Sequence, residues 1–359
     1  MAAQKIGTIE WYRVPVPREE LKRLTARSDA AALVQTVGFL ATAAATGAAS
    51  WIAWAAAAAG TFPVWGVALL VFLHGTVWAF ILNGFHELVH YTVFKTRRLG
   101  TFFLYLYSFL GWFDPVFFRA SHTRHHLYTL HPPKDREVQL PIRMRLWNFL
   151  RVAIVDPLGP YHRARGFFRT AIGRYNGDWQ REIIEEDGPK TKRALVNFSR
   201  FLLIGHAVVI AVAVATQTWQ LIVLVTLAPY YGRWLHFLCN ETQHIGLVDN
   251  VPDFRLCCRT FTVNPIVRFL YWNMNYHTEH HMYAAVPCYR LHRLHKVVRH
   301  ELPAWPHGLI ATWRHIVGIL KRQEAEPGYQ FIPELPGPPE LPGSPGEPGP
   351  GPRRNSLAT

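Results

Sequence analysis

The chain has little cysteine and lacks the motifs that bind the common redox cofactors. Its 359 residues include four cysteines, Cys239, Cys257, Cys258 and Cys288. Their spacing fits no zinc ribbon, ferredoxin or CxxC motif, and the chain has no haem-attachment motif and no GxGxxG flavin fingerprint. We therefore expect four reduced thiols in a cytosolic setting, and no electron-transfer cofactor bound by these motifs.

Charged side chains are missing from two long stretches. Residues 31–94 contain no Lys or Arg and a single acid, Glu87, and residues 201–232 contain no charged residue. Runs of about 20 apolar residues are long enough to cross a bilayer as a helix. The first residues, MAAQKIGTIEWYRVPVPREELKRL, are polar and of mixed charge, so we expect no cleavable signal peptide. The pattern predicts an all-α integral membrane protein.

The apolar segments divide the chain. We expect four transmembrane helices in two hairpins, at about residues 30–59, 64–85, 195–216 and 219–238, beneath a cytosolic helical cap. The second helix should continue past Asn83, and residues 99–112 are too short to span and should be interfacial or re-entrant. A lead-in at 1–29 precedes the membrane domain at 30–325. A Pro/Gly-rich segment at 326–359 reads as a disordered tail.

The basic residues predict the orientation. Neither expected hairpin turn, at 60–63 or 216–218, contains Lys or Arg, whereas the chain has 38 of them elsewhere. Positive residues favour the cytosolic side. We therefore expect both termini, and the histidine clusters described next, to be cytosolic.

The net charge of +14 has two interpretations. It fits contact with anionic lipid headgroups, and it fits docking of an acidic electron donor. The basic residues flank apolar segments, so we expect no nucleic-acid partner.

Histidines are the most informative residues of the chain. They form one HxxxH motif and two HxxHH motifs beside apolar helical stretches, with one more histidine in NETQH. The candidate metal ligands are His86, His90, His122, His125, His126, His244, His277, His280 and His281.

The spacing of these motifs suits more than one ion. In HxxHH on a helix, the first histidine shares a face with both the second (i, i+3) and the third (i, i+4), whereas the adjacent second and third diverge by about 100°. One such turn can therefore reach two ions, or one ion and a neighbouring wall, and the whole set suits two ions with four or five nitrogens each. Zinc is satisfied by four ligands and has no redox chemistry, so a binuclear non-haem iron site that activates dioxygen is the better match.

The alternative for any single histidine is a structural or surface role. Three clusters on one side of a membrane argue against it for the motif histidines. His244 is weaker, because a lone histidine after a helix is usually structural, but His236, Asn240 and His244 share one helical stripe, which favours a metal ligand.

HELVH, HTRHH and HTEHH, in this order, resemble the three histidine boxes of the membrane fatty acid desaturase and hydroxylase superfamily. The resemblance covers roughly residues 62–320. Asn240 and His244 look like the Asn/His pair of acyl-CoA desaturases, which implies a ninth ligand at His244 and a water-mediated metal contact at Asn240. The first box departs from the longer HxxxxH of those enzymes.

The resemblance implies an oxygen-dependent desaturase with two iron ions, dioxygen as co-substrate and a lipid or acyl-chain substrate. It also implies an external electron donor of the ferredoxin, rubredoxin or cytochrome b5 type. A hydroxylase with the same ligands is the alternative, and a zinc transporter or metal sensor is the remaining one. Zinc binds such sites more tightly than Fe(II), so purified protein can carry zinc.

Carboxylates are expected behind the histidines, because a metal-bound imidazole commonly donates its other N–H to a carboxylate or carbonyl. Glu87, Glu279, Asp114 and Asp135 are the candidates. The competing interpretation is an ordinary salt bridge with Arg119, Arg124 or Arg136.

Overall fold

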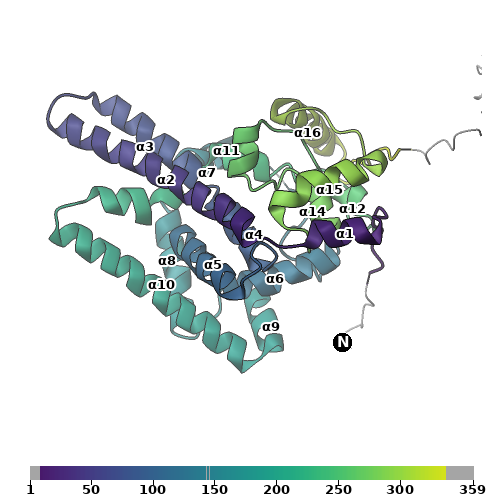
Figure 1. The fold of residues 1–359 in the computed structure, drawn as a ribbon, viewed down its shortest axis with the longest axis horizontal. Coiled ribbons are helices and arrows are strands. Elements are labelled where there is room, and N and C mark those ends of the chain that lie inside the picture. The colour runs from purple at the N-terminus through teal and green to yellow at the C-terminus, as the bar shows by residue number, and fades with distance from the viewer. Residues whose placement is uncertain (1–8, 143, 145, 337–359) are drawn as a thin grey trace, which may run out of the picture.

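The computed structural model describes residues 9–142, 144 and 146–336, and in this part of the chain the regular structure is helical (Figure 1). The only β-type pairings among these residues are isolated bridges. The expected all-α class is therefore confirmed.

The first two long helices form an antiparallel pair. The expected lead-in contains the short helix α1 (Arg18–Thr25), and α2 (Asp29–Ala58) begins where the Ser28 side chain accepts a hydrogen bond from the Ala31 N–H. Gly60, with a positive φ of 76°, then reverses the chain. The chain then runs back through α3 (Val64–Trp78) and α4 (Ile81–Val89), which together form one apolar segment long enough to span a membrane. The helix continues past Asn83, as predicted.

A sharply bent pair follows. Helices α5 (Arg97–Gly111) and α6 (Pro115–Tyr128) meet at 102°. Trp112, between them, is in the left-handed region at φ 57°, and Asp114 accepts from the N–H groups of Val116 and Phe117 at the start of α6. The bend is consistent with the expectation that residues 99–112 do not span the membrane alone.

Shorter helices lead to the last long one. They are α7 (Leu146–Ala153), α8 (Gly159–Ala171) and α9 (Asp178–Asp187), and α10 (Pro189–Ala215) follows. Three helices of the described chain are long and apolar enough to cross a membrane, 29–58, 64–89 and 189–215, and the bent pair α5–α6 would make a fourth.

The prediction of a continuous spanning helix at 219–238 is wrong. This segment breaks into a π-helical turn η1 (Ile222–Thr226), a 3-10 turn η2 (Ala228–Tyr230) and α11 (Trp234–Asn240). Pro229 has no N–H to donate, and Gly232 has a φ of 67°, so neither favours a regular helix here.

Buried polar side chains satisfy the backbone of the broken segment. His74 Nε2 donates to the Leu224 carbonyl at 2.9 Å, and Trp112 Nε1 donates to the Thr226 carbonyl at 3.2 Å. His206 stacks between the rings of Phe109 and Trp112 and lies 3.2 Å from the Thr226 hydroxyl. Non-helical backbone is tolerated at membrane depth when protein groups hydrogen-bond it in this way.

The remaining helices gather at the end of the molecule opposite the tips of the α2–α3 and α10–η1 connections (Figure 1). They are α12 (Phe254–Cys257), α13 (Pro265–Leu270), α14 (His277–Met282), η3 (Cys288–Arg290), α15 (Leu291–Val298), η4 (Arg299–Glu301) and α16 (Leu309–Ala325). The structure thus separates an apolar end from a histidine-bearing end.

The start of the predicted tail packs against the body. Phe331 forms a bridge with Leu247, and its N–H donates to the Gly246 carbonyl at 2.9 Å. The rest of the predicted tail, residues 337–359, and the first eight residues of the predicted lead-in lie outside the described residues. All four cysteines are buried and free, as expected.

Candidate metal centre

The candidate histidines form two adjacent groups, each with ligand atoms within 4.8 Å of one another. The five-histidine cluster contains His86, His90, His122, His126 and His280. The four-histidine cluster contains His125, His244, His277 and His281. Every histidine singled out from the sequence therefore belongs to one cluster or the other.

The two HxxHH turns cross between the clusters. On α6, His122 and His126 face the five-histidine cluster, and the adjacent His125 faces the other one. On α14 the arrangement is reversed, because the middle histidine, His280, leaves its neighbours to join the first group. This is the divergence expected of adjacent residues on a helix.

His244 reaches its cluster by a different route from the one predicted. Helix α11 ends at Asn240, and residues 241–246 form turns, so the helical stripe through His236, Asn240 and His244 does not exist. The His244 ring is fixed from outside the helix, because its Nδ1 donates to the Cys257 carbonyl at 2.8 Å. Its Nε2 lies 2.9 Å from His277 Nε2.

A buried arginine holds the turn that carries His244. The Arg259 guanidinium is fully buried and donates to the carbonyls of Thr242 and Ile245, the latter at 3.2 Å. Its other face lies 5.0 Å from the Trp305 ring centroid. The neighbours of His244 on both sides are therefore tied to one rigid group.

Two carboxylates of the 135–137 segment orient the α6 histidines. Asp135 Oδ2 lies 2.8 Å from His125 Nδ1, and Glu137 Oε1 lies 2.7 Å from His122 Nδ1. Each contact leaves Nε2 to face the cluster. Asp135 was anticipated from the sequence, but Glu137 was not. The only signal for Glu137 was its position two residues after Asp135 in a non-helical segment.

Glu87 lies between two boxes. Its Oε1 is 3.1 Å from His86 Nδ1 and 3.5 Å from His280 Nδ1, and the carboxyl group is fully buried. The side chain thus contacts a histidine on α4 and one on α14.

The other two candidate carboxylates contact different groups. Glu279 hydrogen-bonds to Thr260 and His295, neither of which belongs to a cluster. Asp114 caps α6 through backbone N–H groups. In the described structure both carboxylates position helices that carry histidines and do not touch the rings.

The electrostatic setting suits neutral imidazoles at the cluster histidines other than His125, where the effect of burial is outweighed by the hydrogen-bonded Asp135 carboxylate, which raises the pKa. Burial lowers the pKa of His244 to about 3, and it lowers the pKa values of His277, His280 and His281 well below the ordinary value. A neutral imidazole offers the lone pair that a metal ion needs. Burial also raises the pKa of Glu137 to about 7.

Several buried ring nitrogens have no hydrogen-bond partner among the described residues. Within the two clusters they are His90 Nε2, His126 Nδ1, His277 Nδ1, His281 Nε2 and both nitrogens of His280. Buried polar atoms are rarely left without a partner, so the Nε2 atoms of His90, His280 and His281 fit metal ions in the clusters. Nitrogen donors alone also suit iron, zinc or copper better than calcium or magnesium.

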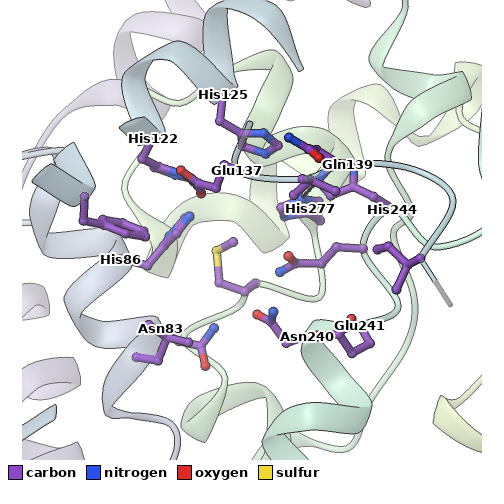
Figure 2. Close-up of a pocket in the computed structure, with 16 residues that line it drawn as sticks. Asn83, His86, His122, His125, Glu137, Gln139, Asn240, Glu241, His244 and His277 are labelled. Atoms are coloured by element: carbon purple, nitrogen blue, oxygen red, sulfur yellow. Dashed lines mark hydrogen bonds and ion pairs between the residues drawn. The ribbon is translucent and has the colours of Figure 1, made fainter. Parts of the chain in front are cut away.

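A cavity of about 400 Å³ adjoins both clusters (Figure 2). His86 and His122 line it from one cluster, and His125, His244 and His277 line it from the other. Asn83 and Asn240 face these histidines across the cavity (Figure 2). Leu82, Phe118, Ile142 and Met274 supply apolar wall.

A comparison with protein families identifies the chain. The model of the fatty acid desaturase family matches residues 63–313, which include every histidine of the two clusters. No curated protein matches the chain. The match confirms the resemblance seen in the histidine boxes. Membership of this family implies a membrane oxidoreductase of the desaturase and hydroxylase type. The chain belongs to the fatty acid desaturase family.

Proposed function

We propose that the protein is an oxygen-dependent di-iron desaturase that introduces a double bond into an aliphatic chain carried by a fatty acyl group or lipid. One observation carries the proposal: histidines from two separate clusters, of five and four rings, line the same cavity. Two ions placed there would both face the same substrate carbons.

The iron pair would supply the dioxygen activation and the hydrogen abstraction that no side chain can perform. The histidines of the two clusters would hold the ions. Glu87, Asp135 and Glu137 would fix the rings that they contact, and Asn240, at the cavity wall, would reach a metal through water.

The cavity walls would position the substrate. Leu82, Phe118 and Met274 offer apolar contact to methylene groups beside the histidines.

The reaction balance requires a partner protein. Dioxygen takes two electrons and two protons, together with two hydrogens from adjacent carbons, and gives an alkene and two waters. The chain has no motif for an electron carrier, so the electrons would come from a donor of the ferredoxin, rubredoxin or cytochrome b5 type. Its basic surface would suit an acidic donor.

We place the protein in the membrane as a multi-pass chain, with both termini and the metal centre on the cytosolic side. The charge-free connections at 60–63 and 216–218 support this orientation. The ligands lie at helix ends and not near the middle of an apolar segment, since His86 and His90 come at the C-terminal end of the 64–89 segment, which disfavours the metal-transporter alternative.

The test is reconstitution. Full-length protein is loaded anaerobically with Fe(II), supplied with an electron donor and lipid extract, and then exposed to dioxygen. A product lighter by two hydrogens supports desaturation, and a product heavier by one oxygen supports the hydroxylase alternative. Full iron loading without any oxygen-dependent product would refute both.

A further inference from the structure

A short segment before α1, residues 11–14, packs against the outside of the metal centre. We call it the N-terminal segment. It lies in no helix or strand, and yet its last residue, Val14, is fully buried. Its contacts converge on α6, α12 and α14, and two of these helices carry cluster histidines.

Trp11 links the end of α6 to α12. Its Nε1 donates to the Leu127 carbonyl at 2.9 Å, one residue after His126. The indole also lies flat on the Phe254 ring, with a centroid distance of 4.0 Å and an interplanar angle of 8°. One side chain therefore contacts both the last turn of the helix that carries the second histidine box and an aromatic ring of α12.

Phe254 in turn contacts a cluster histidine. Its ring is fully buried, and its centroid lies 5.5 Å from that of the His281 ring. His281 Nδ1 lies 3.2 Å from the Thr129 hydroxyl, whereas His281 Nε2 has no partner in the described residues. Successive ring contacts thus lead from Trp11 through Phe254 to the four-histidine cluster.

Two hydrogen bonds join the N-terminal segment to the end of α14. Arg13 Nε donates to the Met282 carbonyl at 2.7 Å, and the Tyr283 hydroxyl donates to the Val14 carbonyl at 2.6 Å. Helix α14 has only six residues, and its N-terminus has no side-chain cap. A helix this short is not stable alone, so its position depends on tertiary contacts such as these.

The other side of α14 is held by different groups. Glu279 hydrogen-bonds to His295 on α15, and His280 Nδ1 lies 3.5 Å from Glu87 Oε1. His280, of the five-histidine cluster, therefore has a partner that is independent of the N-terminal segment. The contacts of this segment bear instead on His281, of the four-histidine cluster.

We propose that Trp11 is a positioning residue of the metal centre. It acts on His281 through Phe254 and on α6 through the Leu127 carbonyl, so that the four-histidine cluster binds its ion tightly only while the N-terminal segment is in place. The inference rests on the two clusters as metal sites and does not depend on the reaction proposed above.

The test is metal binding without turnover. Full-length protein in detergent is loaded with zinc, which has no redox chemistry, and the affinity for each ion is measured by chelator competition. Trp11→Ala should lower the affinity for one ion about tenfold or more and leave the other unchanged. Trp11→Phe keeps a ring beside Phe254 but loses the hydrogen bond, so it should lose less affinity.

Two further variants show whether the effect is specific. Trp147→Ala, at a side chain that is 74% exposed on α7, is the matched control and should shift neither affinity. His244→Ala should already lack the ion of the four-histidine cluster. Adding Trp11→Ala to that variant should therefore leave the affinity for the remaining ion unchanged.

Unchanged affinity for both ions in Trp11→Ala would overturn the proposal. An equal loss of both ions would also overturn it, because it would indicate a general loss of structure. Tyr283→Phe decides the question if Trp11→Ala does not fold, since it removes only the hydrogen bond to the Val14 carbonyl. It should weaken the same single ion by a smaller factor, and a shift of neither ion or of both equally would contradict the proposal.

Discussion

His244 Nε2 and His277 Nε2 lie 2.9 Å apart, although one ring comes from a turn after α11 and the other from the start of α14. Two neutral ring nitrogens this close are well placed to share an ion. The pair makes His244 a member of the four-histidine cluster and not an isolated structural histidine.

His244→Ala should therefore remove one metal ion and leave the other. The four-histidine cluster would keep three rings, whereas the five-histidine cluster would lose none. Elemental analysis of protein after dialysis should show about one ion per chain in place of two. His307→Ala, at an exposed histidine, should keep both ions. Loss of both from His244→Ala would mean that the clusters do not bind independently.

Glu137→Gln should weaken the five-histidine cluster. The carboxylate orients His122, and loss of such a partner typically lowers metal affinity by about 10- to 100-fold. A chelator competition titration measures this change. Glu182→Gln, at an exposed acid paired with Arg136, is the matched control and should not shift the titration. Unchanged affinity in Glu137→Gln would argue against the orienting role.

Asp114→Ala should lower stability without lowering metal affinity. Its carboxylate caps α6, and loss of such a cap costs about 1 kcal/mol. The midpoint of thermal unfolding in detergent should fall, while the metal content of the folded protein stays at two ions. A loss of one ion at low temperature would instead restore Asp114 as a partner of the histidines.

His206→Ala should destabilise the broken segment. The substitution removes one of the two donors to the Phe109 carbonyl and the stack between Phe109 and Trp112, which together should cost about 1–3 kcal/mol. Thermal unfolding tests this against Val208→Ala, an exposed position on the same helix. Equal midpoints for the two variants would show that the histidine does not stabilise this segment.

The parts that could be predicted from the sequence are those governed by local periodicity. The apolar run at 30–59 and the i, i+4 spacing of His86 and His90 depend on neighbouring residues, and the structure agrees with both. The segment at 219–238 was apolar enough to span, but its path depends on distant donors such as His74 and Trp112. Hydropathy alone carries no information about such long-range hydrogen bonds.

The same contrast between local periodicity and long-range contacts explains which site residues could be predicted from the sequence. The sequence predicted all nine histidines because they occur in motifs, and it predicted their sharing between two ions from helical geometry. Glu137 was missed because its contact with His122 depends on the path of residues 129–137 after α6, where no regular element carries the periodicity. His244 was identified in NETQH and by its resemblance to the Asn/His pair, whereas the helical stripe that also favoured it does not exist, since α11 ends at Asn240.

The crossing of the α6 and α14 histidines has a consequence for how the protein matures. Neither cluster can be completed by the first two boxes, because each awaits at least one ring from residues 277–281. A chain emerging from the ribosome therefore lacks both full ion sites until almost four-fifths of it has been made. Both ions would be acquired late. Each ion would then be bound by histidines of both α6 and α14, so that early and late parts of the chain are linked through metal only in the finished protein.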